Sequence, residues 1–313
     1  MRILIIHEVH KVLEDLLRGK GHSVDSLMQL SRDEVLSILP KYDGLIVRSA
    51  LKVDKEVIDA GTKLKFIGRL GAGMEGIDAD YATEHNIVLY NAPEGNRSAV
   101  GEQSVGMLLS LFNNLNRADK EVRKGIWKRE ANRGEEIQGK TVAIIGYGNM
   151  GSAFAEKISG FGAKVIAYDK YKKNYGNEFV EEVSLQEVFN NADILSLHTP
   201  LQDDTFHMVN KEFLKSFKKE ITLINTSRGQ VVNTPDLVEC LNSGKINGAC
   251  LDVIEYEGMS FEAVMNNEDK VVFDFLKKSD KVILSPHIAG WTHQSNERMA
   301  SVLAHKILLN TAN

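Results

Sequence analysis

The sequence contains few of the residues and patterns that mark several protein classes. It has only two cysteines, Cys240 and Cys250. Their spacing fits neither a disulfide framework nor a metal site, so we expect two buried thiols in a reducing cytosol. No apolar stretch is long enough to cross a bilayer. Residues 1–7 are too few for the hydrophobic core of a signal peptide and are better explained as a first strand. We therefore expect a cytoplasmic protein that binds no metal.

The chain also lacks a strong charge of either sign and any short tandem repeat. Its formal net charge is −5, which gives no reason to expect nucleic acid or an anionic membrane as a partner. The composition, 43% hydrophobic and 26% charged, is typical of a soluble globular protein. With 313 residues, the chain is long enough for two ordinary domains.

Apolar runs alternate with helical patterns, and the alternation restarts near residue 141. This predicts an α/β protein with two parallel sheets, each covered by helices on both faces. The predicted strands lie at 3–6, around 24, and at 44–47, 66–70, 87–90, 142–145, 165–168, 194–197, 222–225, 249–253 and 282–285. The predicted helices lie at 11–20, 32–39, 54–60, 78–85, 98–124, 152–161 and 292–313. We expect an irregular connection over 256–281.

One stretch predicts a dinucleotide site. An apolar run ends at Gly146, and Gly148 and Gly151 complete the pattern G-x-G-x-x-G. The first glycine permits a tight turn, the second lets the backbone approach a pyrophosphate, and the third lets the next helix pack against the sheet. Asp169 ends the following apolar run, where a carboxylate accepts hydrogen bonds from a ribose and repels a 2′-phosphate. We therefore predict NAD rather than NADP. Lysines at positions 170, 172 and 173 would weaken that preference.

A second glycine cluster also fits the pattern. Gly71, Gly73 and Gly76 follow another apolar run, but no long helix and acid-terminated strand come after them. We predict a tight strand-to-helix turn here. A second nucleotide site is the alternative.

Four predicted strands in the second half end in polar residues suited to catalysis. They are followed by His198-Thr199-Pro200, by Asn225 to Gly229, by Asp252 with Glu255 and Glu257, and by Ser285-Pro286-His287. In doubly wound sheets such strand ends lie beside the cofactor. Each group alone is also typical of an ordinary surface residue.

Hydride transfer between an alcohol and a ketone gives these residues roles. His287 suits the proton transfer near neutral pH. Arg228 suits a substrate carboxylate and the C2 oxygen, because its guanidinium is a planar fork. Glu257 beside His287 would set the tautomer of the imidazole. Glu255 is the alternative partner.

Together these motifs make the chain resemble the D-isomer-specific 2-hydroxyacid dehydrogenases. The matching pieces, in the family's order, are Gly146-Tyr-Gly-Asn-Met-Gly151 with Asp169, His198-Thr-Pro200, Asn225-Thr-Ser-Arg-Gly229, Ala249-Cys-Leu-Asp-Val253 with Glu257, and Pro286-His-Ile-Ala-Gly290. Val47-Arg-Ser49, Gly71-Ala-Gly73 and Asn91-Ala-Pro93 also match, so the resemblance covers nearly the whole chain.

The resemblance implies a role for each matching position. It makes Arg228 the substrate-orienting arginine, His287 the acid/base and Glu257 its partner. The cofactor contacts that it implies are Gly146, Gly148, Asn149, Met150, Gly151, Asp169, His198, Thr199, Pro200, Thr226, Asp252 and Gly290. On the substrate side it implies Arg48, Ser49, Gly71, Ala72 and Gly73, so that the second glycine cluster would hold a substrate carboxylate.

The family fold has two doubly wound parallel-sheet domains around a cleft. A Rossmann-like NAD-binding domain, expected over 98–291, is inserted into a flavodoxin-like substrate domain, expected over 1–97 and 292–313. The resemblance also implies a homodimer, with the helix at 98–124 near its interface. Two departures stand out: Gly258 occupies a place where the family often has proline, and the connection from Glu257 to His287 is longer than usual.

Within the family, the chain most resembles short phosphoglycerate dehydrogenases, which convert 3-phosphoglycerate to 3-phosphohydroxypyruvate for serine synthesis. Because the chain ends after the final helix, we expect no C-terminal regulatory domain. The arginines available for a substrate phosphate are Arg48, Arg69, Arg97, Arg129 and Arg133. Glyoxylate/hydroxypyruvate reductase is the nearest alternative, followed by D-lactate dehydrogenase. An NAD(H)-binding corepressor that acts through protein partners is an alternative of another class.

Overall fold

The computed structural model describes residues 1–258 and 270–311. The chain divides into two compact units. The first unit comprises Met1–Arg97 and Gly290–Asn313, and the second comprises Ser98–Ala289. No helix among the described residues combines the length and the apolar character needed to span a membrane.

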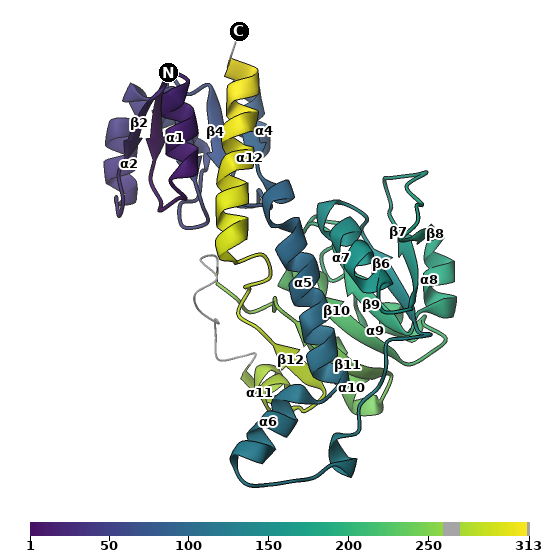
Figure 1. Cartoon of the computed structure of the whole chain (residues 1–313). Helices are drawn as coiled ribbons and strands as arrows, with labels where there is room; N and C mark the ends of the chain where they lie inside the picture. Colours follow the sequence, from purple (N-terminus) through teal and green to yellow (C-terminus); the bar gives the residue numbers. More distant parts are fainter. Residues whose placement is uncertain (259–269, 312–313) are drawn as a thin grey trace. The chain divides into compact units, whose positions relative to one another are not determined.

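The first unit is built on a five-stranded parallel sheet. Its strands pair in the order β2-β1-β3-β4-β5, the flavodoxin-like order. Their bounds are β1 (Arg2–Ile5), β2 (Ser23–Ser26), β3 (Gly44–Val47), β4 (Phe66–Arg69) and β5 (Val88–Asn91). One face packs on α1 (Val12–Gly19) and α12 (His293–Thr311), which lie side by side in Figure 1. The other face packs on α2 (Arg32–Ile38), α3 (Lys55–Ala60) and α4 (Ala79–Glu84), and a short 3-10 turn, η1 (Leu39–Lys41), follows α2.

The second unit is built on a seven-stranded parallel sheet. Its order, β12-β11-β10-β9-β6-β7-β8, is that of a Rossmann fold with one added strand, and the order reverses between β6 and β9. The bounds are β6 (Thr141–Ile145), β7 (Lys164–Tyr168), β8 (Glu181–Glu182), β9 (Ile194–Leu197), β10 (Ile221–Asn225), β11 (Ile246–Leu251) and β12 (Val282–Leu284). Ligands of such sheets bind at the carboxyl ends of the strands beside this reversal.

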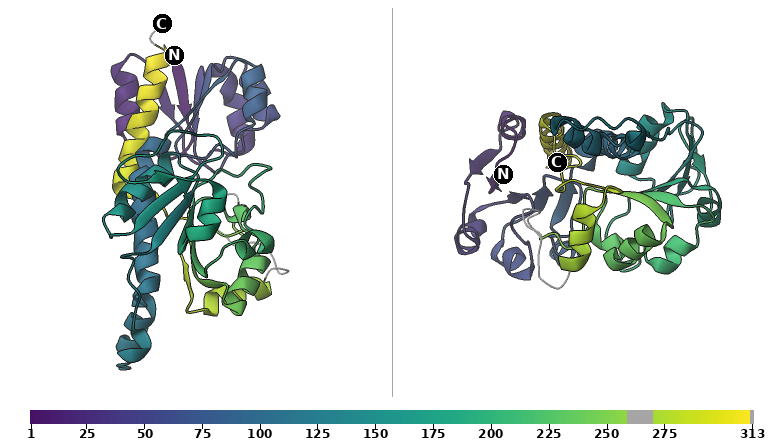
Figure 2. Two further views of the ribbon diagram at one scale, coloured as in Figure 1. Left: turned by 90° about the vertical axis from the view of Figure 1, so that its right-hand side faces the viewer. Right: turned by 90° about the horizontal axis from the view of Figure 1, so that it is seen from below.

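Helices cover both faces of the second sheet, as Figures 1 and 2 show. On one face lie α5 (Pro93–Phe112) and α7 (Asn149–Ser159). On the other lie α8 (Leu185–Asn191), α9 (Lys211–Lys215), α10 (Thr234–Ser243) and α11 (Lys270–Lys278). Helix α6 (Leu115–Arg123) and two 3-10 turns, η2 (Glu130–Asn132) and η3 (Gly229–Val231), complete the unit. Because the sheet is buried on both faces, its central strands are continuous apolar runs rather than alternating ones.

The predicted fold class, two doubly wound parallel sheets, is confirmed, with local differences. Helices α8, α9 and α10 had no predicted counterpart. The helix predicted over 98–124 begins earlier, at Pro93, and is broken into α5 and α6. It breaks at Asn114, whose φ is +53°, and the amide of Glu135 bonds the Phe112 carbonyl at the end of α5. Strand β8 was not predicted, and its two residues are too few for a periodic signal. The irregular connection predicted over 256–281 is wrong for α11, while residues 259–269 lie outside the described part of the chain.

Candidate active site

The glycine turn between β6 and α7 has the geometry of a phosphate site. The φ of Gly146 is +91°, and a Cβ there would lie 2.6 Å from the His198 carbonyl oxygen. A Cβ on Gly151 would lie 2.1 Å from the Gly146 oxygen, whereas one on Gly148 would meet nothing within 4 Å. Helix α7 starts at Asn149, and no side chain caps it. The first amides of the helix, including that of Met150, are therefore available to a phosphate.

The second glycine cluster is built differently. The Gly71 amide bonds the Arg69 carbonyl, and a Cβ on Gly71 would lie 2.0 Å from Nη1 of Arg69. The Ala72 carbonyl accepts the side-chain amide of Asn91 at 2.8 Å. Helix α4 begins only at Ala79, and the Asp78 side chain already caps it. These glycines, including the half-buried Gly73, therefore offer no helix N-terminus to a second dinucleotide.

The other residues assigned to the substrate follow β3 in the first unit. Arg48 bonds the Glu8 carbonyl at 3.3 Å and the Asn296 side chain at 3.2 Å. Its guanidinium also lies 4.7 Å from the centre of the Trp291 ring, within the range of a cation–π contact. Ser49 comes next and is partly exposed. The substrate role of both residues stays a prediction.

Asp169 ends β7 and is held by three backbone amides. Its Oδ2 accepts Tyr147 N–H at 2.7 Å, and its Oδ1 accepts the amides of Tyr171 and Lys172 at 2.9 and 2.8 Å. Burial alone would raise the pKa of this carboxyl, but the amide bonds outweigh it and hold the pKa below the usual value. Asp169 is therefore ionised at neutral pH, and Oδ2 keeps a lone pair that a ribose hydroxyl can use.

The three lysines beside Asp169 have contacts of their own. Lys170 forms an ion pair with Asp204, and Lys172 donates to the Tyr147 carbonyl at 3.1 Å. Lys173 lies 5.9 Å from the centre of the Tyr168 ring. These contacts reduce the lysines' ability to receive a 2′-phosphate, which favours NAD.

We expect Asp169→Ala to reduce the preference for NADH over NADPH at least about tenfold, equivalent to ~1.4 kcal/mol, because the charge that repels a 2′-phosphate is lost. The ratio of kcat/KM for the two cofactors measures this. Asp204→Ala, which releases Lys170 but keeps Asp169, is the matched comparison. A wild-type enzyme that uses both cofactors equally well would contradict the role given to Asp169.

His198 and Thr199 follow β9, at the reversal of the sheet. The Nε2 of His198 shares a hydrogen bond of 2.8 Å with the Ser196 hydroxyl. Burial lowers the pKa of His198 to about 3, so the ring is neutral at pH 7 and cannot act as the acid. In the described part of the chain, the buried Nδ1 of His198 and Oγ1 of Thr199 have no hydrogen-bond partner. Buried polar atoms without partners are rare, and these two fit a polar ligand such as the cofactor.

Three further predicted cofactor contacts differ in their surroundings. Pro200 is exposed, and the hydroxyl of buried Thr226 lies 3.2 Å from that of Ser104. Gly290, with a φ of +94°, falls in the first unit. Its carbonyl accepts the Ser295 hydroxyl at 2.5 Å, just before α12. A cofactor contact of Gly290 stays a prediction.

Asp252 is buried and organises the segment that carries His287. Its carboxylate accepts the Ser285 hydroxyl at 2.5 Å and the amides of Ile288 and Ala289 at 3.0 and 2.8 Å. Its carbonyl accepts the His287 amide at 2.8 Å. These bonds hold His287 at a φ of +53°, a left-handed conformation that is uncommon for a residue with a side chain.

His287 forms a close pair with Glu257. The His287 Nδ1 lies 2.8 Å from Oε2 of Glu257, and both side chains are 17% exposed. The carboxylate fixes the Nδ1–H tautomer when the ring is neutral and stabilises the imidazolium when it is charged. In the neutral ring, the proton-accepting lone pair is therefore on Nε2.

Arg228 stands on a turn that packs against the turn of Glu257. Its Nη1 donates to the Ser227 carbonyl at 2.7 Å, and its own carbonyl accepts the Asn225 side-chain amide at 3.0 Å. A Cβ on the next residue, Gly229, would lie only 2.0 Å from the Ile254 carbonyl oxygen. The segments of Arg228, Glu257 and His287 are thus contiguous: the first two touch through Gly229, and the last two share a hydrogen bond.

Glu255 is not the partner of His287. Its Oε1 lies 2.5 Å from Nε2 of His207, and its Oε2 accepts the Thr234 amide at 3.0 Å. The interpretation of Glu255 as a rival partner is therefore wrong. His207 did not stand out in the sequence, because its contacts come from residues 26 and 48 positions away.

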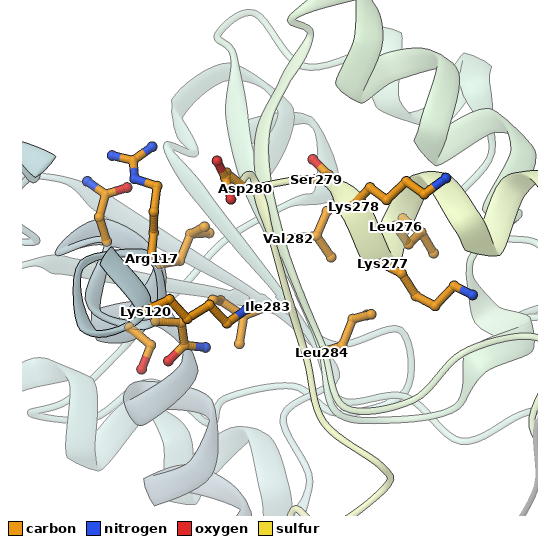
Figure 3. Close-up of a pocket in the computed structure, with 14 residues that line it drawn as sticks. Arg117, Lys120, Leu276, Lys277, Lys278, Ser279, Asp280, Val282, Ile283 and Leu284 are labelled. Atoms are coloured by element: carbon orange, nitrogen blue, oxygen red, sulfur yellow. The ribbon is translucent and has the colours of Figure 1, made fainter. Parts of the chain in front are cut away.

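A cavity of about 310 Å³ lies elsewhere in the second unit, between α6 and the segment of α11 and β12. It is lined by none of the predicted site residues. Figure 3 shows the ammonium groups of Lys277 and Lys278 extending away from Arg117. Lys277 and Lys278 therefore do not converge with Arg117 on a common ligand.

Comparison with known proteins identifies the family. The model of the D-isomer specific 2-hydroxyacid dehydrogenase NAD binding domain matches residues 105–289. A hydroxypyruvate reductase from Thermotoga maritima is 34% identical over 306 residues, 98% of this chain and 97% of the relative. A D-3-phosphoglycerate dehydrogenase from Archaeoglobus fulgidus is 31% identical over 310 residues, 98% of this chain but only 57% of the relative.

Solved structures give the same result. D-lactate dehydrogenase from Aquifex aeolicus, complexed with NAD and lactic acid, has a TM-score of 0.85 and 28% sequence identity, and the match covers 100% of this chain and 96% of the other. The sheet order, the glycine turn and the matched family model all indicate the same family. The chain belongs to the D-isomer-specific 2-hydroxyacid dehydrogenases and is an NAD-dependent oxidoreductase.

Proposed function

We propose that Arg228, Glu257 and His287 interconvert a D-2-hydroxy acid and its 2-keto acid. The observation that carries this proposal is the 2.8 Å contact between His287 Nδ1 and Glu257. It gives the imidazole a defined tautomer in the same unit as the dinucleotide turn. The neighbouring turn supplies Arg228, a cation suited to the carboxylate that every 2-hydroxy acid carries.

The proposed division of labour follows from the chemistry of each side chain. Bound NAD supplies the acceptor for the hydride that leaves C2 during oxidation. His287 takes the proton of the C2 hydroxyl on Nε2, and Glu257 stabilises the imidazolium that results. Arg228 fixes the substrate carboxylate and polarises the C2 oxygen. In reduction, the imidazolium returns the proton to that oxygen.

As the substrate we propose 3-phosphoglycerate, oxidised to 3-phosphohydroxypyruvate for serine biosynthesis. Its support is the similarity along 98% of this chain to proteins named D-3-phosphoglycerate dehydrogenase. The chain spans only a little over half the length of these relatives. The second candidate is hydroxypyruvate or glyoxylate reduction, because the Thermotoga maritima hydroxypyruvate reductase matches over 97% of its own length.

A substrate panel separates these candidates. Initial rates at 340 nm are measured with 3-phosphoglycerate and NAD, and with phosphohydroxypyruvate, hydroxypyruvate, glyoxylate and pyruvate and NADH. We expect kcat/KM for phosphohydroxypyruvate to exceed that for hydroxypyruvate at least about tenfold, as a phosphate-specific contact of ~1.4 kcal/mol requires. The reverse order selects the second candidate. NADH binding without turnover of any acid would favour a sensor instead.

We propose that the protein is a homodimer and that α6 with the segment after it forms part of the interface. Leu115, Val122, Ile126 and Trp127 expose 51%, 49%, 37% and 78% of their surface, respectively. All four fall within residues 115–127, and exposed apolar surface is typical of protein interfaces. Size-exclusion chromatography with light scattering should give a molar mass twice the 34.8 kDa of one chain. Trp127→Ser should lower that mass. A wild-type monomer at micromolar concentration would contradict the proposal.

A further inference from the structure

We propose that His207 and Glu255 form a positioning pair that holds Glu257 against His287. The inference rests on the proposed function, because it assigns a support to the proposed acid/base. Neither residue belongs to the motifs of the dinucleotide site or to the proposed triad. His207 precedes the bridge between Val209 and Val232, and Glu255 lies in the loop after β11.

The loop that carries Glu257 is a tight turn. The Glu257 amide donates to the Ile254 carbonyl at 3.3 Å, so residues 254–257 form a four-residue turn with Glu255 as its second member. Two residues before the turn, the Asp252 amide bonds the Asn225 carbonyl at 3.0 Å. A displacement of this turn would move the Glu257 carboxylate away from the imidazole.

Glu255 is anchored at two separate points. Its Oε1 lies 2.5 Å from Nε2 of His207. Its Oε2 accepts the amide of Thr234 at 3.0 Å, in the first turn of α10. A carboxylate bound to a helix N-terminus and to an imidazole has few orientations left. The backbone of the turn is fixed along with the side chain.

His207 is itself held from several sides. Its amide donates to the Gln230 carbonyl at 2.8 Å, and its Nδ1 lies 3.4 Å from the Asn233 side-chain amide. The Phe206 ring stacks on the imidazole with 4.1 Å between centroids. His207 therefore joins the turn after Arg228, the start of α10 and the turn of Glu257.

The φ of His207 is +49°. A substitution that tests the side chain alone must therefore tolerate this left-handed backbone conformation. Asparagine tolerates the left-handed conformation, so His207→Asn keeps the backbone. Its amide is too short to replace Nε2, and the contact with Glu255 is lost. His207→Gln, in contrast, carries a donor at the depth of Nε2 and should retain much of the contact.

The test is a double-mutant cycle on the whole chain. The quantity measured is kcat at saturating NADH, with the keto acid that the substrate panel selects. We expect His207→Asn to lower kcat about tenfold, the lower end of the range for residues that orient a functional group. In the Glu257→Gln background, the same change should cost less than about twofold, because there is no longer a carboxylate to position. His207→Gln should restore most of kcat. Lys219→Ala, which breaks an ion pair with Asp193 in the same unit, is the control and should leave kcat unchanged.

The outcomes distinguish the two proposals. Equal losses from His207→Asn in both backgrounds, or no loss in either, would overturn the positioning role while the triad stands. An unimpaired Glu257→Gln enzyme would instead overturn the proposed function. If His207→Asn does not fold, Glu255→Gln replaces it in the cycle, since it keeps the size of the side chain and removes one of its two acceptors.

Discussion

Replacing His287 with glutamine is expected to lower kcat about 10²- to 10⁴-fold, the range for loss of a general acid/base. Glutamine keeps a polar group near Glu257, which lies 2.8 Å from Nδ1 in the native pair, but it cannot exchange a proton near neutral pH. The measurement is the steady-state rate at saturating substrate and NADH. The dissociation constant of NADH, from fluorescence titration, should change less than about twofold. Proton transfer lowers the barrier of the reaction and does not contribute to cofactor binding in the ground state.

The matched control for this variant is His85→Gln. His85 is exposed at the end of α4, and its Nδ1 bonds the Tyr81 carbonyl at 2.8 Å. The control should keep wild-type kcat. A His287→Gln enzyme with wild-type turnover would remove His287 from the mechanism. A collapse of NADH affinity with kcat preserved would reassign it to cofactor binding.

The parts of this site that sequence reasoning identified are those with local causes. Gly146 is required by its own φ of +91°, and Gly151 because a Cβ there would lie 2.1 Å from the Gly146 oxygen, five residues earlier. Asp169 ends a strand within the same β-α-β unit. Such constraints produce short patterns, and a pattern of glycines and an acid at fixed spacing can be recognised without coordinates.

The contacts between distant segments of the site left no pattern, even where the residues themselves belong to a motif. Asp252 is bonded to Ser285, Ile288 and Ala289, more than thirty positions away. The choice between Glu255 and Glu257 depended on two histidines. His207 bonds Glu255, and His287 bonds Glu257. Two acids two residues apart cannot be told apart by spacing. The turn between them, closed by a hydrogen bond from the Glu257 amide, sends their side chains to different partners.

Helix α11 was missed for another reason. Its sequence, KVVFDFLKK, has apolar positions suited to one helical face, and Leu276 is fully buried against the sheet. It follows a polar stretch that gave no sign of a helix start, so the whole connection looked irregular. Nine residues of an amphipathic pattern are too few to stand out when no cap marks their beginning.

Replacing Gly229 with alanine is expected to lower kcat/KM about 10²-fold, because a displacement of about 1 Å at the proposed triad costs that much. The added Cβ would lie 2.0 Å from the Ile254 oxygen, 2.1 Å from the Ile254 carbonyl carbon and 2.5 Å from the Glu255 nitrogen. All three are backbone atoms, so no rotamer change relieves the overlap. The turn of Arg228 and the turn of Glu257 must therefore separate, at a cost of about 1–3 kcal/mol in stability.

The control for Gly229→Ala is Gly160→Ala, at the end of α7. There the nearest atom to a new Cβ is the Lys157 carbonyl oxygen at 3.7 Å, an ordinary contact. This variant should keep wild-type kcat/KM and thermal midpoint. If Gly229→Ala unfolds earlier yet keeps wild-type kcat/KM at a temperature where it is folded, then the spacing of the two turns contributes only to stability. If its kcat/KM falls while NADH binding is kept, the contact at Gly229 is what sets Arg228 and Glu257 at the distance that the reaction needs.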